Sequence, residues 1–171
     1  MDEILEFPDP RLRRKSAPVT LFDEELANLL QRLAAAMERE GGIGIAAPQL
    51  DAPVRAFLVD LSALKDQEKL RREFINPVLT ELQGHTTFRE GCLSVPDFNY
   101  PVKRARRLHV HYQDRTGAVH ELEAEGLLSV AIQHEFDHLE GRLFVDRLPW
   151  PKRWWYRWKL VRASRNKPMK L

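Results

Sequence analysis

Apolar residues recur at helical spacing in three segments of this 171-residue chain. The first segment covers about residues 23–40, and its apolar stripe predicts an amphipathic helix with one face against a core. The stripe consists of Leu26, Leu29, Leu30, Leu33 and Met37. Gly41 and Gly42 follow directly and are expected to end this helix.

A second helix is predicted over about residues 127–140, with Gly141 as its stop. It is apolar on more than one side, which predicts a central, buried position. Its residues form two rows, Leu128, Ile132 and Leu139 in one and Leu127, Val130, Ala131, His134 and His138 in the other. A third helix should begin at Pro151, which a first helical turn tolerates, and should carry Trp154, Trp155 and Trp158 on one side.

Strands are predicted where apolar residues cluster or alternate over shorter stretches. Residues 54–61 and 74–79 are two such stretches. Leu108, Val110 and Tyr112 alternate before the turn-like residues 114–117, a pattern typical of a hairpin. We therefore expect a single-domain α+β fold, with antiparallel strands around a central helix and one further helix near each end of the chain.

The composition, 43% hydrophobic and 30% charged, suits one compact domain with a buried core. No run of about 18 apolar residues occurs, and the first residues lack a basic region followed by an apolar stretch. We therefore expect neither secretion nor a membrane span. Cys92 is the only cysteine, which excludes an internal disulfide and favours a reducing, cytoplasmic location.

Positive charge is concentrated near the C-terminus, although the formal net charge is only +2. Nine lysines and arginines follow Asp146, the last acidic residue, and the other 18 basic and 25 acidic residues leave −7 for the rest of the chain. Such a tail could meet an anionic surface, or it could be the solvated face of a helix. The charge pattern leaves both interpretations open.

The most informative motif is HExxH, which lies inside the predicted central helix. His134 and His138 are about one helical turn apart, so both imidazoles can bind one metal ion. Glu135 lies beside them and can transfer protons. Buried histidines are also often only hydrogen-bonded, so the motif needs support from other residues.

A catalytic site of this kind needs a third protein ligand and an open position for water. A metzincin peptidase would have a histidine at position 144, where this chain has Phe144. A thermolysin-like enzyme would use a downstream glutamate, but no glutamate follows Glu140. The third ligand must therefore lie upstream or be Asp146.

Upstream lies the lone thiol, Cys92, within residues 90–95. An isolated cysteine is most often a small buried hydrophobic residue. In a chain that also carries HExxH, its thiolate becomes a good candidate, because it is a strong ligand for Fe(II) or Zn(II).

A third block, residues 42–49, follows the first helix. Its two glycines permit a bend and a close backbone approach, and its small alanines allow tight packing. By itself this block is weak evidence. A dinucleotide-binding loop is a poor alternative, because these glycines follow a helix and the third glycine of that motif is absent.

The three blocks in this order, residues 42–49, 90–94 and 133–138, resemble the peptide deformylase family. The similarity extends through residues 7–13 and 126–128, and so over nearly all the chain up to about Leu148. It implies a catalytic domain over residues 1–148. Residues 149–171 would be a basic, tryptophan-rich C-terminal helix and tail of the same domain.

The resemblance implies a metal-dependent hydrolase that removes the formyl group from formyl-methionine at the N-terminus of nascent polypeptides, giving formate and a free amino terminus. It implies one divalent metal ion, natively Fe(II), with Zn(II) or Ni(II) as alternatives. The implied metal ligands are Cys92, His134 and His138. The implied catalytic groups are the Glu135 carboxylate and, for the oxyanion, Gln49 and the Leu93 backbone N–H.

The general chemistry of metal-bound water and proton transfer agrees with these roles. A bound metal lowers the pKa of water from about 16 towards 7, and Glu135 could take that proton and later protonate the leaving amine. Losing one oxyanion donor typically costs about 3 kcal/mol of barrier.

Apolar residues near the histidines can explain selection of methionine. Leu127, Val130 and Ala131 share the histidine face of the helix and could form the wall of an apolar slot beside the metal. Ile43, Gly44 and Phe88 match other substrate-binding positions of the family. Ordinary core packing is the alternative interpretation for each of them.

Four polar residues complete the implied site. Glu90 and Arg104 are expected to orient the ligands or to pair with Asp137, the alternative being a surface ion pair of little energy. Many bacterial members have an arginine that contacts the substrate backbone where this chain has Asn99. That departure puts substrate preference beyond methionine in doubt.

The family resemblance also suggests partners. Formyl-methionyl nascent peptides are the expected substrates, with neither membrane nor DNA as a partner. Related bacterial enzymes dock on the ribosome through a C-terminal segment, and RNA phosphates would attract the basic tail. The alternative is that the tryptophans of the tail only anchor it to the domain.

Two rival functions come from other classes. A metallopeptidase would share the HExxH chemistry, but it would cleave internal peptide bonds and would not need Cys92 as a ligand. A non-enzymatic RNA-binding protein would explain the tail, but it would leave the Cys/His/His/Glu set without a purpose.

Overall fold

The computed structural model describes residues 2–62, 64, 71–154 and 156. Its α-helices are α1 (Glu24–Arg39) and α2 (Leu127–Leu139), and its short 3-10 helices are η1 (Pro10–Arg13), η2 (Ala47–Leu50) and η3 (Phe144–Arg147). Its strands are β1 (Gly44–Ala46), β2 (Ala56–Asp60), β3 (Arg71–Gln83), β4 (Thr86–Cys92), β5 (Val95–Arg104), β6 (Arg107–Gln113) and β7 (Val119–Glu125).

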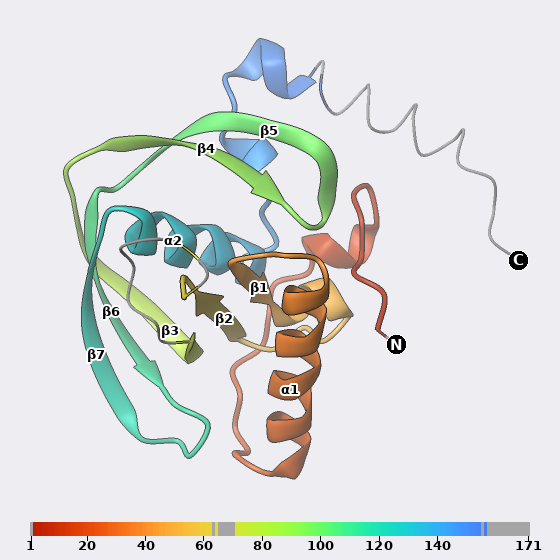
Figure 1. The fold of residues 1–171 in the computed structure, drawn as a ribbon, viewed down its shortest axis with the longest axis vertical. Coiled ribbons are helices and arrows are strands. Elements are labelled where there is room, and N and C mark those ends of the chain that lie inside the picture. Colours follow the sequence, from red (N-terminus) through yellow and green to blue (C-terminus); the bar gives the residue numbers. More distant parts are fainter. Residues whose placement is uncertain (1, 63, 65–70, 155, 157–171) are drawn as a thin grey trace, which may run out of the picture.

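The strands form two antiparallel sheets around α2. One sheet has five strands in the order β1-β2-β3-β6-β7, and the other is the β4–β5 hairpin. In Figure 1, β3, β6 and β7 curve around one side of α2, while the β4–β5 hairpin passes over it. The predicted α+β fold, with antiparallel strands around the HExxH helix, is confirmed.

Helix α1 begins and ends where local chemistry dictates. The Asp23 side chain accepts a hydrogen bond from the backbone N–H of Leu26 at 3.1 Å and so caps the N-terminus. Gly41 follows the helix with a positive φ of 65°. The apolar stripe packs against β1, β2 and η2, which confirms the amphipathic helix predicted there.

Helix α2 is buried on nearly every side, as its sequence predicted. Ile132 and Leu139 pack into a core with Phe57 and Phe74 of the large sheet. The helix ends at Leu139, and Gly141, which follows the C-cap residue Glu140, has a φ of 68°. A Cβ at this position would lie 2.4 Å from the backbone oxygen of Arg13, so both conformation and space require glycine there.

The strand predictions hold for most of the large sheet and miss the small one. Residues 54–61 contain β2, residues 74–79 fall within β3, and the alternation before residues 114–117 is the β6–β7 hairpin. Strand β1 and the β4–β5 hairpin were not predicted. The hairpin carries Cys92 at the end of β4 and passes over α2 (Figure 1).

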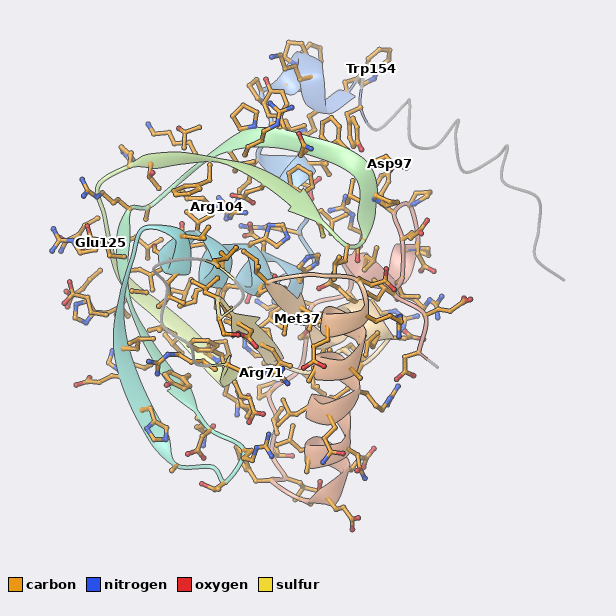
Figure 2. All side chains as sticks on the ribbon, in the orientation of Figure 1. Met37, Arg71, Asp97, Arg104, Glu125 and Trp154 are labelled. Carbon is orange, nitrogen blue, oxygen red and sulfur yellow. The ribbon has the colours of Figure 1, made fainter. Side chains whose placement is uncertain are left out.

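A short helical segment follows η3 and begins at Trp150, one residue before the predicted start. Tyr156 is buried, and its ring stacks on Phe98 of β5 with centroids 3.5 Å apart. Trp154 is 66% exposed and lies beyond the β4–β5 hairpin, at one end of the molecule (Figure 2). Trp155 and residues 157–171, which include Trp158, lie outside the described residues, and the division at residue 148 stays a prediction.

No helix in the described part of the chain combines the length and the hydropathy that a membrane crossing requires.

Candidate metal centre

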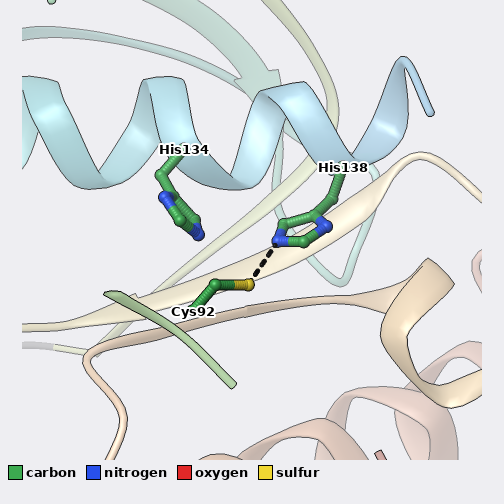
Figure 3. Close-up of side chains that lie close together, drawn as sticks. All are labelled: Cys92, His134 and His138. Carbon is green, nitrogen blue, oxygen red and sulfur yellow. Dashed lines mark hydrogen bonds between the residues drawn. The ribbon is translucent and has the colours of Figure 1, made fainter. Parts of the chain in front are cut away.

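A thiol and two imidazoles converge between α2 and the end of β4. One ligand atom from each of Cys92, His134 and His138 lies within 4.8 Å of the others. The Cys92 Sγ is 3.3 Å from the His138 Nε2, and Figure 3 shows the sulfur below both rings. Within the described residues, no other group of three such side chains meets.

Two unrelated parts of the fold produce this convergence. The one-turn spacing on α2 places the rings of His134 and His138 side by side, with centroids 5.3 Å apart. Cys92 ends β4, where a register irregularity after Gly91 pairs Cys92 with Val95 of β5. The tight end of this hairpin aims the thiol at the helix.

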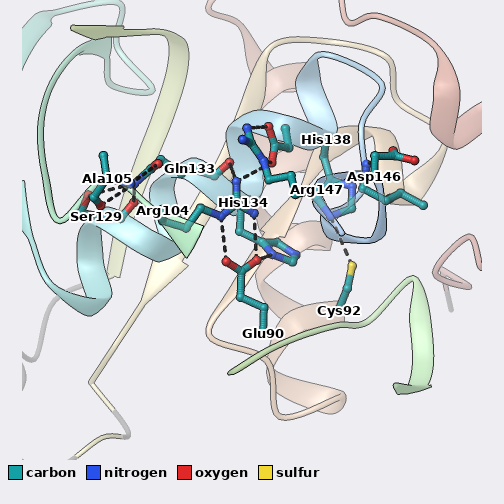
Figure 4. Close-up of polar contacts among 12 residues, drawn as sticks. Glu90, Cys92, Arg104, Ala105, Ser129, Gln133, His134, His138, Asp146 and Arg147 are labelled. Carbon is teal, nitrogen blue, oxygen red and sulfur yellow. Dashed lines mark hydrogen bonds and ion pairs between the residues drawn. The ribbon is translucent and has the colours of Figure 1, made fainter. Parts of the chain in front are cut away.

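A buried ionic network holds the first imidazole. The His134 Nδ1 lies 2.8 Å from a carboxylate oxygen of Glu90, and Arg104 donates two hydrogen bonds to the same carboxylate (Figure 4). Arg104 also pairs with Asp137, whose carboxylate accepts hydrogen bonds from Arg147. Glu90, Arg104 and Asp137 are all buried, so they do not form a surface ion pair.

The network fixes the charge state of its carboxylates. Burial alone would raise the pKa of Glu90, but hydrogen bonds from Arg104 and His134 lower it below its usual value. For Asp137, burial is likewise outweighed by Arg147 and Arg104, and its pKa is lowered. Both stay ionised, and a proton held on Nδ1 by Glu90 leaves the Nε2 of His134 free as a ligand.

The donor set fits a divalent transition metal. Burial and the neighbouring His134 lower the pKa of His138 well below its usual value, which keeps this ring in the neutral, metal-binding form. Thiolate and imidazole ligands suit Fe(II), Zn(II) and Ni(II). The carboxylate behind His134 is the arrangement that usually supports metal-bound histidines.

Glu135 lies next to the cluster and is only 4% exposed. Burial raises its pKa to about 7. Among the described residues, its Oε2 has no hydrogen-bond partner. A Cβ added at Gly44 would lie 2.4 Å from Oε1, so this glycine leaves the space that the carboxylate occupies.

Gln49 approaches the cluster from η2. It is 1% exposed, and its Oε1 accepts a hydrogen bond from the backbone N–H of Ala46 at 2.8 Å. Its Nε2 donates to the Ser94 Oγ at 3.0 Å and lies 3.9 Å from the Cys92 Sγ. The amide is thus held with its donor end towards the cluster.

A cavity of about 350 Å³ opens beside the cluster. Strand β1 and the loop before it, β4 and α2 form its walls. The lining residues are Gly41, Gly42, Ile43, Gly44, Gln49, Phe88, Arg89, Glu90, Gly91, Cys92, Leu93, Leu127, Val130, Ala131, His134 and Glu135.

Most of the predicted site residues meet at this cavity. Of the predicted metal ligands, Cys92 and His134 line the cavity and His138 does not. The predicted catalytic groups Glu135, Gln49 and Leu93 and six of the predicted substrate contacts also line it. Asn99 is exposed on β5 and accepts a hydrogen bond from the Nε of Arg89. Asp146, the alternative ligand, pairs instead with Arg13.

Sequence reasoning missed three residues of the site. Ser94 orients Gln49, Arg147 closes the network on Asp137, and Arg89 lines the cavity. Ser94 is the last residue of the predicted block and Arg89 directly precedes it, but their contacts with Gln49 and with the cavity depend on the fold around them. Nothing local indicates Arg147, because its role depends on how η3 packs against α2.

The chain is similar to known deformylases over almost its whole length. The family model described as polypeptide deformylase matches residues 1–154. A peptide deformylase of Wolinella succinogenes is 46% identical over 153 residues, which cover 88% of this chain and 89% of that protein. The peptide deformylase 2 of Xanthomonas axonopodis pv. citri is 44% identical over 166 residues, covering 95% and 96%.

A solved structure agrees with these relatives. The crystal structure of a peptide deformylase from Legionella pneumophila matches with a TM-score of 0.87 and 38% sequence identity. The match covers 100% of this chain and 99% of that one.

Proposed function

This chain belongs to the polypeptide deformylase family, and from that membership we propose how its own residues carry out the family's reaction. The enzyme removes the N-formyl group of nascent peptides by hydrolysing the formyl amide. The family is metal-dependent, and a Cys/His/His cluster that could hold an ion is present. The assignment of individual residues and of the native ion is the proposal.

Cys92, His134 and His138 hold the metal ion in this proposal. When bound, such an ion acidifies a water molecule, from a pKa of about 16 towards 7, and polarises the formyl carbonyl. The donor set and the Glu90 carboxylate behind His134 support this role. We propose Fe(II) as the native ion, with Zn(II) or Ni(II) able to replace it.

Glu135 is the general base and then the general acid. A pKa raised to about 7 by burial is suited to taking a proton from water and returning it to the leaving amine at neutral pH. Its position against Gly44 holds the carboxylate at the edge of the cavity. The products are formate and a peptide with a free amino terminus.

Gln49 and the Leu93 backbone N–H stabilise the oxyanion. The Gln49 amide is buried and held at both ends, by Ala46 and by Ser94, so it does not need to reorganise during the reaction. Leu93 follows Cys92 directly and lines the same cavity.

The cavity receives the methionine side chain. Its apolar wall contains Ile43, Phe88, Leu127, Val130 and Ala131, which suit an unbranched thioether. Gly44 allows the substrate backbone to approach β1.

The observation that carries the proposal is the convergence of Cys92 and both histidines beside Glu135, at the end of an apolar cavity. The test is formate release from a formyl-methionyl peptide, with loss of internal peptide bonds measured in parallel. Wild-type protein should release formate and leave internal bonds intact. Glu135→Ala should retain the metal and lose turnover. Undiminished formate release by this variant would overturn the assigned role.

We propose further that the basic C-terminal residues dock on the ribosome, in the cytoplasm. The nine positive charges after Asp146 support contact with RNA phosphates, and Trp150 and Trp154 are exposed. Tyr156 anchors the segment to β5, so a truncation that keeps Tyr156 and removes residues 157–171 should leave the domain intact. In a salt titration, the truncated form should bind the ribosome more weakly than the full chain. Equal affinity of both forms would dismiss docking.

A further inference from the structure

Arg89 is the single lysine or arginine among the described residues that line the active-site cavity. It lies on β4 between Phe88 and Glu90, and its side chain is exposed. Its Nε donates a hydrogen bond to the Asn99 Oδ1 on the neighbouring strand. Asn99 is neutral, so it positions the guanidinium without cancelling its charge.

The other charges around the cavity are already compensated or buried. Glu90 is paired with Arg104 and hydrogen-bonded to His134. Glu135 is buried against Gly44. No ion pair joins Arg89 to a described carboxylate, and its Nε is hydrogen-bonded to the neutral Asn99. A peptide that enters the cavity therefore meets one uncompensated cation.

The spacing along β4 indicates which part of a peptide Arg89 can reach. A strand rises about 3.3 Å per residue, so the Cα of Arg89 lies roughly 10 Å from that of Cys92. The formyl group reacts beside Cys92, and an extended substrate advances by a similar distance per residue. The residues immediately after the methionine therefore fall within reach of the long Arg89 side chain.

We propose that Arg89 is a specificity-determining residue that favours formyl-peptides with an acidic side chain at the first or second position after the methionine. The inference rests on the proposed function of this site. A guanidinium offers a planar fork of donors that matches a carboxylate, and it repels a lysine side chain at the same place.

The expected size of the preference follows from the exposure of Arg89. Exposed ion pairs are weak, so one favourable pair changes kcat/KM by about two- to fivefold. Exchanging glutamate for lysine in the peptide removes an attraction to Arg89 and adds a repulsion from it. The ratio of kcat/KM between such peptides should therefore approach about tenfold at low salt and shrink at high salt.

The experiment measures formate release by metal-loaded enzyme from four peptides. Glutamate or lysine occupies the first or the second position after formyl-methionine, and the remaining residues are alanine. Wild-type enzyme should prefer glutamate at one of the two positions. Arg89→Gln should bring that Glu/Lys ratio close to one, and Arg89→Lys should retain part of it.

Two further variants make the test specific. Asn99→Asp places a carboxylate against Arg89 and should also abolish the preference, although the arginine remains. Arg106→Gln removes an equal charge from an exposed arginine that does not line the cavity, and it should leave the ratio as in wild type. This control separates a local contact from the general field of the protein.

An unchanged Glu/Lys ratio in Arg89→Gln would overturn the inference, as would an equal change in Arg106→Gln. In both cases wild-type enzyme still releases formate, so the proposed function stands. Failure of metal-loaded wild-type protein to release formate from any formyl-peptide would instead overturn the proposed function, and this inference with it.

Discussion

Glu135 and Gly44 show how one side chain of the site depends on the absence of another. The Glu135 carboxylate occupies the space where any other residue at position 44 would place its Cβ. The backbone of β1 can approach α2 this closely only because Gly44 lacks that atom. The proposed general base is therefore positioned by a neighbouring strand as well as by its own helix.

Gly44→Ala should consequently lower activity without removing the metal. The new Cβ would lie 2.4 Å from the Glu135 Oε1, so the carboxylate or the strand must shift by about an ångström. Displacements of this size cost on the order of 100-fold in rate. Formate release and metal content measure the two effects. A Cβ at Gly91 would have no neighbour closer than 3.8 Å, so Gly91→Ala should lose far less activity. Similar losses in both variants would contradict the explanation.

The sequence predicted the residues that carry the chemistry more completely than those that support them. The HExxH motif indicates His134, His138 and Glu135, the lone thiol upstream makes Cys92 a candidate ligand, and the family resemblance implies the roles of all four. Ser94, Arg147 and Arg89 could not be assigned in this way, because their contacts depend on strand register and on the packing of η3.

Among the secondary-structure elements, the β6–β7 hairpin depends on one exposed carboxylate. The Asp114 side chain accepts hydrogen bonds from the backbone N–H and the hydroxyl of Thr116 and from the backbone N–H of Ala118, and it lies 2.7 Å from the His120 Nε2. The Thr116 hydroxyl, His120 and the backbone donors hold the pKa of Asp114 well below its usual value.

The depressed pKa gives the hairpin a defined pH dependence. Because the folded pKa lies below the unfolded value of about 4, the stabilisation is present above pH 4 and is lost as the pH falls through the folded pKa. Asp114→Ala should therefore unfold at lower urea concentration than wild type at pH 7, and the difference should narrow below about pH 3. A carboxyl titration by NMR with its midpoint at 4 or above would contradict this.

The position that follows the end of α2 is also restricted in its residue type. Gly141 has a positive φ, and the backbone of Arg13 occupies the space that a Cβ would need. Gly141→Ala should lower the free energy of unfolding by more than about 2 kcal/mol, since the strained φ alone costs about 1–2 kcal/mol. Urea unfolding measures the change. Gly41 has a similar φ, and a Cβ there would have no atom within 4 Å, so Gly41→Ala should lose less stability. A larger loss in Gly41→Ala than in Gly141→Ala would refute the steric argument.

Elements with a clear apolar pattern were predictable and the others were not. The stripes of α1 and α2 extend over several turns, and the strands of the large sheet have clear apolar runs. Strand β1 has three residues, and β4 and β5 pair only with each other, so their alternation is weak. A bulge at Gly91 interrupts it further.

At the scale of the whole molecule, the proposed metal site joins the two sheets through α2. The β4–β5 hairpin contributes Cys92, while α2 packs against β1, β2 and β7 of the other sheet. A bound ion should therefore stabilise the entire fold, because its ligands come together only when the hairpin is in place.

Removal of the metal should lower the unfolding temperature. Ligand binding to the folded state alone contributes about 2.7 kcal/mol when the free ligand is at 100 times its Kd. Thermal unfolding before and after chelation, and again after adding Zn(II), measures the effect. Cys92→Ala should show a much smaller response to chelator. An equal response in wild type and Cys92→Ala would mean that the thiol does not hold the ion.

The most direct test of the account is a metal titration followed by formate release. Protein stripped of metal under anaerobic conditions and reloaded with Fe(II) should release formate from a formyl-methionyl peptide at a rate that rises in proportion to bound metal and levels off at one ion per chain. Formate release by the stripped protein at the reloaded rate, or none at full loading, would contradict the claim that Cys92, His134 and His138 form the reaction centre.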